Sequence, residues 1–380
     1  MAEKEMGAAR DMKRKLMSIV LIFFPLCGCL PTSIVDDILI IEGEGYDYIG
    51  NGNIIGTITM PNFEQSGNQG SQGAGLPTTA SMIRYLSGKT YNGKSLADKF
   101  QAEGQKVVRP GKIRLILFNK RLAKYGLSRE LAFRNRDPDT PRDMTIAVVD
   151  GSCKELMTAT NYQTQIPIAR YVQDLIIQNN EQDYPDTDMA SFLYSYYGPY
   201  MDPFMPIIKK SGDHLEMRGL ALFKHDKYAM SIKDNQVFLF KMLYQSFDQG
   251  VYDFQYEPGK HIALRNVRTT IHYRVKNGNS SSPDIIAYTK VLGQVRQASP
   301  EAISKFSAPA MSIRLEKHLQ KRADRLVQQF QKKGIDPLQL GEQVRSFTYH
   351  FDGKTWKERY PHAHFHSRVD VNIVQTGISH

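Results

Sequence analysis

Cysteine is scarce in this chain, with three residues among 380, at positions 27, 29 and 153. A disulfide framework of the kind that supports small secreted domains is therefore excluded. The first long apolar run, residues 16–26, is shorter than the roughly 20 residues that a membrane-spanning helix needs. The glycine-rich stretch 62–77 lacks the Lys-Ser/Thr of a phosphate-binding loop, and the sequence has no Gly-x-Ser-x-Gly nucleophile elbow.

The charge balance is moderately positive, with 49 Lys and Arg against 39 Asp and Glu. Such a balance suits a protein held against an anionic lipid surface. We find no stretch in which basic and aromatic residues are interleaved, so the charge does not indicate nucleic-acid binding. The content of aliphatic and aromatic residues is that of a globular protein rather than a disordered one.

The strongest functional motif lies in residues 12–29. Three cations, Lys13-Arg14-Lys15, precede the apolar run 16–26, which is the order of a secretory signal. The run ends in Leu26-Cys27-Gly28-Cys29, which matches the bacterial lipoprotein cleavage pattern of Leu, any residue, a small residue and Cys. Met12 would itself be a normal start for such a signal.

The residue types of this motif fit the chemistry of lipidation. A thiol is needed to form the thioether to diacylglycerol, Gly28 lets the peptidase reach the bond before Cys29, and Leu26 fills an apolar subsite. We predict a signal peptide over residues 1–28 and a mature N-terminus at Cys29 that carries both S-diacylglycerol and N-palmitoyl groups. The alternatives are an uncleaved anchor or an ordinary signal with a chance Cys. With Cys29 lipidated, Cys153 has no partner for an intrachain disulfide.

The pattern of apolar residues predicts an α+β (mixed α/β) protein of three domains, each a β-sheet flanked by helices. The predicted domains are an N-terminal α/β domain over 29–198, a small β-β-α domain over 199–249, and a C-terminal domain over 250–380. We read the stretch from Gly198-Pro199 to Pro206 as breaker residues and place the first boundary near Gly198.

In the first domain, strands alternate with helices, which predicts a partly parallel sheet. We read glycines 43, 45, 50 and 52 as turns. The predicted strands are 34–41, 54–60, 113–118 and 145–149, and the predicted helices are 119–125, 152–157, 168–178 and 188–197.

The remaining chain predicts a hairpin and a helix, then an antiparallel sheet with long helices. Period-two alternation marks the strands, and an apolar stripe from Leu315 to Phe330 marks the long helix. We expect the final strand to complete the antiparallel sheet. The predicted strands are 214–223, 228–232, 251–256, 262–275, 285–295 and 369–374, and the predicted helices are 237–243, 300–333 and 336–347.

Two groups of residues could carry chemistry. His362, His364 and His366 alternate, so on one strand they would share a face that could bind zinc or respond to protonation. The favoured interpretation is a solvated or interface face. Cys153 follows a strand end, where a nucleophile is common, but a free Cys is more often a small buried hydrophobe. We therefore predict no catalytic, cofactor-binding or metal residue.

Carboxylates and tyrosines also cluster. Asp36-Asp37 and the group Asp183, Asp186 and Asp188 have no second acid at a defined spacing, so we interpret them as surface loops. The tyrosines at 194, 196, 197 and 200 could line a pocket or interface, since Tyr suits half-wet surfaces. Packing against the core is the favoured interpretation for them.

Three stretches together resemble the Ger(x)C family, the lipoprotein C subunits of spore germinant receptors. They are the lipobox at Cys29, the segment 218–227 (Arg-Gly-Leu-Ala-Leu-Phe-Lys-His-Asp-Lys), and the segment 328–341 with Asp336 and Gly341 ahead of Trp356. Leu30-Pro31 stands where the family usually has Trp-Asp, and the 62–77 loop resembles an insertion.

The resemblance implies three α/β domains held by lipid at the outer face of the spore inner membrane. It implies integral-membrane A and B subunits as partners, a role in the germination response to nutrients, and no catalytic residues or cofactor. The alternative functions are a solute-binding lipoprotein that captures a nutrient directly, and a surface hydrolase, for which no convergent acid–base set is found.

Overall fold

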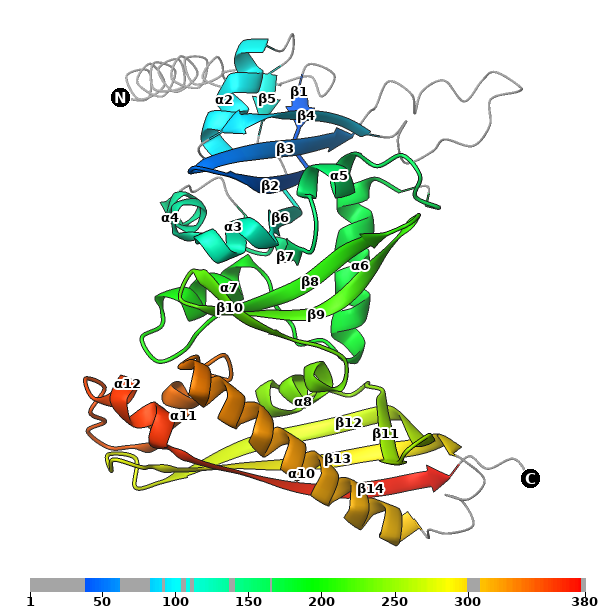
Figure 1. Ribbon diagram of the computed structural model, residues 1–380, viewed down its shortest axis with the longest axis vertical. Helices are drawn as coiled ribbons and strands as arrows, with labels where there is room; N and C mark the ends of the chain where they lie inside the picture. The colour runs from blue at the N-terminus through cyan, green and yellow to red at the C-terminus, as the bar shows by residue number, and fades with distance from the viewer. Residues whose placement is uncertain are drawn as a thin grey trace, which may run out of the picture. The chain divides into compact units, whose positions relative to one another are not determined.

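The computed structural model describes residues 38–61, 83–90, 93–103, 107–109, 113–136, 141–164, 166–298 and 308–376. The chain divides into two compact units, Met1–Leu39 and Ile40–His380. The second unit contains the elements from β2 to β14 that Figure 1 labels. The short strand β1 (Ile38–Ile40) lies at the division between the units.

An eight-stranded mixed sheet forms the first part of this unit. Strands β2, β6, β7 and β8 are parallel to one another, and the other pairs are antiparallel. This confirms the predicted partly parallel sheet. The strand order is β10 (Lys227–Ile232), β9 (His214–Lys224), β8 (Phe204–Ser211), β7 (Thr145–Val149), β6 (Leu115–Asn119), β2 (Gly43–Gly50), β3 (Asn53–Pro61) and β4 (Ile83–Thr90).

Helices cover this sheet because its central strands are apolar on both sides. Every residue of β6 and β7 is buried, as expected for parallel strands between two layers of helices. One apolar cluster joins Leu115 and Ala147 to Leu156 and Val172 of the helices α5 and α6. The helices of this region are α2 (Gly93–Glu103), α3 (Lys120–Tyr125), α4 (Ser128–Arg136), α5 (Cys153–Thr158), α6 (Ile168–Gln182) and α7 (Met189–Tyr197), and β5 (Val107–Arg109) is a further short strand.

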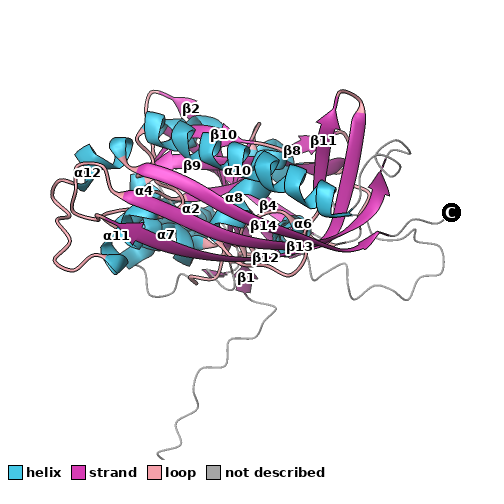
Figure 2. Ribbon diagram, turned by 90° about the horizontal axis from the view of Figure 1, so that it is seen from below, coloured by secondary structure: helices cyan, strands magenta, loops and turns pink. Residues whose placement is uncertain are grey.

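A four-stranded sheet forms the second part, in the order β11 (Tyr252–Glu257), β12 (Lys260–Lys276), β13 (Asp284–Ala298) and β14 (His364–Thr376). Strands β11 to β13 are an antiparallel meander, as predicted. Strand β14 pairs with β13 in parallel, so our expectation that it would complete an antiparallel sheet is wrong. The chain between them crosses over through helices, and Figure 2 shows the three long strands side by side.

Helices cover one face of the second sheet. Helix α8 (Asn235–Tyr244) is buried from Val237 to Leu243, within an apolar cluster that also includes Phe204 of β8, Leu222 of β9 and Phe330 of α10. That cluster makes the core continuous between the two sheets. The other helices here are α10 (Ala308–Lys333), α11 (Leu340–Phe347), α12 (Trp356–Arg359) and the 3-10 turn η4 (Tyr360–His362).

Helix α10 covers the free edge of the second sheet. Glu316 accepts from Val371 N at 3.1 Å, Gln320 donates to Val369 O at 3.3 Å, and Asp324 accepts from Ser367 N at 2.8 Å. Four residues of helix rise about 6 Å and two residues of strand span about 6.6 Å, so the two repeats stay in register. The edge of β14 is thereby protected from pairing with other chains.

Four of the described strands were not predicted: β2, β4, β5 and β8. Gly43 and Gly45 lie within β2 rather than in turns, whereas Gly50 and Gly52 have positive φ at the β2–β3 turn, as predicted. The stretch that we read as a chain breaker includes the start of β8, at Phe204. Strands β8 to β10 continue the sheet of β6 and β7 across Gly198. The division into three domains at 198 and 249 stays a prediction.

Candidate functional site

The predicted lipidation site, Cys29, lies outside the described residues, as do Asp36-Asp37 and the stretch 62–77. Lipidation therefore stays a prediction from the sequence. The other two stretches that resemble the Ger(x)C family are described, and the fold brings them together. They meet where the segment before β8 and the end of β9 contact the loop between α10 and α11.

Two buried aspartates, Asp202 and Asp336, hold this junction together. The Asp202 N–H donates to the Asp336 carbonyl at 2.9 Å, and the Asp336 N–H donates to Asp202 Oδ2 at 2.9 Å. Asp202 also accepts from Lys224 Nζ at 3.1 Å and from the His225 N–H at 3.0 Å. The Asp202 carboxylate therefore bonds both to the end of β9 and to the loop between α10 and α11, and the positive charge of Lys224 balances its negative charge.

The Asp336 carboxyl group caps helix α11. Its Oδ1 accepts from Leu340 N at 2.9 Å, and its Oδ2 accepts from Gly341 N at 2.7 Å, which satisfies two backbone donors at the start of the helix. Burial raises the pKa of Asp336 from 3.8 to about 7, and the nearby Asp202 charge acts in the same direction. The two backbone N–H groups and Lys224 favour the ionised form and oppose this rise in pKa.

Glycine is required where α11 begins. A Cβ on Gly341 would lie 2.3 Å from Nε1 of Trp356 and 2.8 Å from Cβ of Tyr200, closer than non-bonded atoms approach. Trp356 is itself buried, 3% exposed, and stacks at an angle on Phe351 and Tyr360. A cavity of about 220 Å³ remains beside Asp202, Lys224 and Asp336.

The junction joins segments that are far apart in the sequence. Its carboxylates are occupied by backbone donors and by Lys224. Lys224, Asp336, Gly341 and Trp356 all come from the stretches singled out in the sequence. Asp202 was missed, because a single carboxylate between Met201 and Pro203 carries no motif.

A second candidate site is a crevice of about 430 Å³ at the carboxyl ends of the parallel strands. β2 and β6 are neighbours in the sheet, and the chain leaves their carboxyl ends toward β3 and toward β7. Open α/β sheets bind ligands at such a place, where the connections diverge. Its lining residues are Asp47, Tyr48, Ile49, Asn119, Lys120, Arg121, Lys124, Asp150, Gly151 and Ser152.

Several polar groups of this crevice already have partners. Asp47 accepts from Cys153 N and Lys154 N, both at 2.8 Å, and so occupies the N-terminus of α5. Asn119 accepts from Leu122 N at 2.8 Å and caps α3. Lys120 pairs with Asp150 at 3.3 Å. The rim of the crevice carries the cations Lys120, Arg121 and Lys124.

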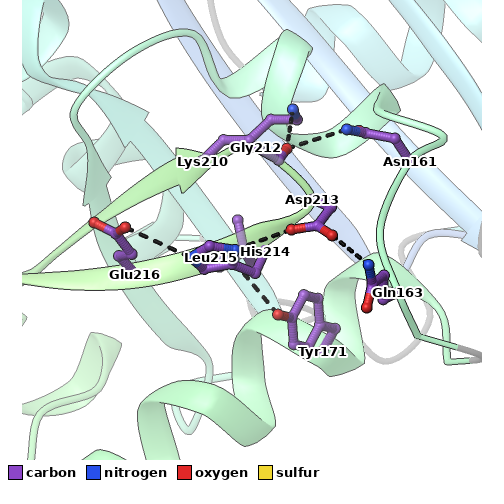
Figure 3. Close-up of polar contacts among 9 residues, drawn as sticks. All are labelled: Asn161, Gln163, Tyr171, Lys210, Gly212, Asp213, His214, Leu215 and Glu216. Atoms are coloured by element: carbon purple, nitrogen blue, oxygen red, sulfur yellow. Dashed lines mark hydrogen bonds and ion pairs between the residues drawn. The ribbon is translucent and has the colours of Figure 1, made fainter.

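A third polar cluster holds the tip of the β8–β9 hairpin, as Figure 3 shows. Lys210 and Asn161 donate to the Gly212 carbonyl at 2.7 and 3.1 Å, and Gln163 bonds to the Asp213 carboxylate. His214 lies between Asp213 and Glu216, and its hydrogen bond to Asp213 raises the pKa of the imidazole. The cluster is exposed, and it fixes a hairpin rather than forming a pocket.

The histidine group is not arranged as we expected. His364 and His366 are exposed on β14, but His362 belongs to the 3-10 turn η4, so the three do not share one strand face. His364 bonds to Asp284 at 3.3 Å. Among the described residues, no three His, Cys, Asp or Glu side chains come together as metal ligands would.

Cys153 is a buried thiol beneath β2. It is fully buried, and burial followed by the Asp47 charge raises the pKa of its thiol well above the usual value. A thiol of this kind is not a thiolate and does not act as a nucleophile. The interpretation of Cys153 as a small buried hydrophobe is confirmed.

Two of the clustered aspartates bond to backbone N–H groups, whereas two of the clustered tyrosines are exposed. Asp188 caps α7 through Ser191 N at 2.7 Å, and Asp183 accepts from Val251 N at 2.7 Å, so both have structural roles. Tyr194 and Tyr197 are 61% and 54% exposed, so our preference for core packing is wrong for these two. They occupy an outward position on α7.

Comparison with known proteins agrees with this arrangement. Residues 32–210 match the spore germination protein N-terminal domain, and residues 218–377 match the spore germination B3/GerAC-like C-terminal domain. The chain belongs to the Ger(x)C family of spore germination proteins. The two matches together include every residue of the Asp202–Asp336 junction, so the junction connects the two domains of the family.

Individual Ger(x)C relatives extend over nearly the whole chain. Spore germination protein GerQC of Bacillus cereus is 28% identical over 376 residues, which are 97% of this chain and 100% of GerQC. The crystal structure of the GerBC protein has the same fold, with a TM-score of 0.53 at 14% identity, covering 87% of this chain and 97% of GerBC. The mixed α/β fold class that we predicted is confirmed.

Proposed function

We propose that this protein is the lipid-anchored C subunit of a nutrient germinant receptor, held at the outer face of the spore inner membrane. The observation that carries the proposal is the order of features along one chain. A lipobox ending at Cys29 is followed by both domains of the spore germination family. No helix among the described residues combines the length and the apolar character needed to cross a bilayer.

In this proposal the protein acts by contact rather than by catalysis. Two or more acyl chains on Cys29 give stable membrane attachment, whereas a single chain is marginal. The tether keeps the folded unit at high effective concentration near integral-membrane A and B subunits. The buried thiol of Cys153 and the occupied carboxylates of the junction support a non-enzymatic role.

Lipidation is tested by the intact mass of protein extracted from spore membranes. We expect the chain to begin at Cys29 and to carry the mass of diacylglycerol plus an N-acyl group. Cys29→Ser should release the protein from the membrane when the membrane is washed at high salt, which removes electrostatic contacts but not an acyl anchor. Cys27→Ser is the matched control, because position 27 accepts any residue, and it should leave the attachment intact. An unmodified Cys29 would refute the anchor.

Recovery of the tagged protein from solubilised spore membranes tests the receptor role. We expect two integral-membrane subunits to be recovered with it, and deletion of the gene to abolish germination with the matching nutrient. Recovery of the protein alone would contradict the proposal even if the lipid is present.

Direct capture of a small nutrient is the second candidate function, and the crevice between β2 and β6 favours it. Its volume of about 430 Å³ is at the lower end of the range for small-molecule sites. Calorimetric titration of the purified protein with amino acids, sugars and nucleosides tests this function. Binding that Asn119→Leu removes would support it, whereas the absence of heat with all three classes would exclude it.

A further inference from the structure

The outward face of helix α10 carries charge of one sign. Among its described residues, no exposed side chain is acidic, although the helix contains Glu316 and Asp324. Most of its exposed residues are cations instead. The exposed Lys and Arg residues of α10 are Arg314, Lys317, Lys321, Arg322, Arg325, Lys332 and Lys333.

Four of these cations form one row, which we call the α10 basic face: Lys317, Lys321, Arg325 and Lys332. Residues three, four or seven positions apart lie on the same side of a helix, so their side chains project in one direction. At 1.5 Å per residue the row is about 23 Å long. Figure 1 shows α10 lying across the second sheet, and the apolar stripe of the helix, not this row, faces that sheet.

The unequal distribution of charge on α10 follows from its hydrogen bonds to β14. Both of its acidic side chains bond to the backbone of edge strand β14, Glu316 to Val371 N and Asp324 to Ser367 N. Glu316 lies on the side of the helix toward β14. Asp324, three positions from Lys321 and seven from Lys317, lies at one edge of the basic face with its carboxylate bonded to β14.

Repulsion between neighbouring cations of the row is small, and the helix macrodipole favours the cations of the last turn, Lys332 and Lys333. No acidic side chain is exposed among the described residues of α10, so the charge of the row complements an anionic surface.

We propose that the α10 basic face binds the anionic headgroups of a phospholipid surface. Protein interfaces depend on buried aromatic and apolar anchors and are depleted in Lys, whereas the exposed outward side of α10 is rich in Lys and Arg and has one large apolar residue among those described, Ile313. A plane of anionic headgroups instead attracts each nearby Lys or Arg through long-range electrostatics, without shaped pockets. The contact is additional to the acyl anchor and does not require a lipid on Cys29.

The test uses the predicted mature chain, residues 29–380 with Cys29→Ser, so that neither a lipid nor the apolar signal segment is attached. The vesicles are phosphatidylcholine with or without about one third phosphatidylglycerol. We expect binding to the anionic vesicles only, weakening as salt is raised. Each cation at such a surface contributes about fivefold in affinity. Lys317→Gln, Lys321→Gln and Arg325→Gln together should therefore weaken binding about 100-fold.

The matched control removes three exposed cations elsewhere, by Arg129→Gln, Lys154→Gln and Lys209→Gln. Both triple variants have the same net charge, and thermal unfolding verifies that both fold. We expect the control to lose only a few-fold in affinity. Equal losses in the two variants would overturn the proposal, as would equal binding to vesicles with and without phosphatidylglycerol. Cross-linking of the face to an acidic protein segment, with vesicle binding unchanged by the α10 substitutions, would also overturn it.

Discussion

The junction between the two family domains should make the stability of the protein depend on pH through one carboxyl group. Burial raises the pKa of Asp336 to about 7 in the folded state, from 3.8 for an exposed aspartate. Between about pH 4 and pH 7 the folded state therefore retains a proton that the unfolded chain has lost. Stability from this group is fully present below pH 4, falls as pH rises to 7, and is constant above it.

The size of this fall is set by the change in pKa. One pKa unit corresponds to about 1.4 kcal/mol, so the shift of Asp336 amounts to at most about 4 kcal/mol in the free energy of unfolding. Asp336→Asn removes the titration, because an amide has no proton to lose in this range. We expect the variant to lose the fall between pH 4 and pH 7 and to keep the contributions of all other groups.

The single tryptophan of the chain provides the assay. Trp356 is 3% exposed and packs against Gly341, so its fluorescence reports opening of the junction itself. Urea unfolding is followed at pH 4.5, 5.5, 6.5 and 7.5 for the wild type, Asp336→Asn, and the exposed control Asp143→Asn. We expect the control to follow the wild type. Parallel stability profiles for the wild type and Asp336→Asn would show that Asp336 is not the titrating group.

Three further predictions concern packing. Gly341→Ala should destabilise the protein by about 1–3 kcal/mol and change Trp356 fluorescence, because the new methyl group overlaps the indole ring; a melting temperature equal to that of the wild type would contradict this. Glu316→Ala and Asp324→Ala should each cost about 1–3 kcal/mol and promote self-association at the uncovered edge of β14, measured by urea unfolding and light scattering. With the other two cysteines replaced, Cys153 should react with a thiol reagent only on unfolding, because it is buried and protonated; fast labelling of the native protein would exclude this environment.

Local signals in the sequence were sufficient for much of the fold. Strand β7 and helix α3 were predicted almost to the residue, because a short apolar run and a helical spacing ended by Gly126 are features of neighbouring residues. The apolar stripe of α10 was equally clear, since a 3.6-residue repeat persists along the whole helix. The lipobox and the family resemblance also came from contiguous residues.

Features that depend on distant residues were not available from the sequence. The glycines of β2 were read as turns, but a Cβ on Gly45 would lie 2.5 Å from Sδ of Met157 in α5. Gly43 and Gly45 are needed because helices more than 100 residues later approach them closely, whereas Gly50 has positive φ at the turn. In the same way, Pro206 was read as a breaker, and it lies in β8 because β8 pairs with β7 and β9 on its two sides.

Contiguous residues were enough to predict many of the helices and strands and the family that the protein resembles, and lipidation at Cys29 stays a prediction from them. Three other features required the folded chain: β14 runs parallel to β13, His362 leaves the strand of the other two histidines, and Asp202 meets Asp336 across 134 residues. The two groups of features differ in how far apart along the sequence the residues that determine them lie. Propensity and periodicity act between neighbours, whereas strand direction and a buried pair of carboxyl groups are fixed by packing of the whole core.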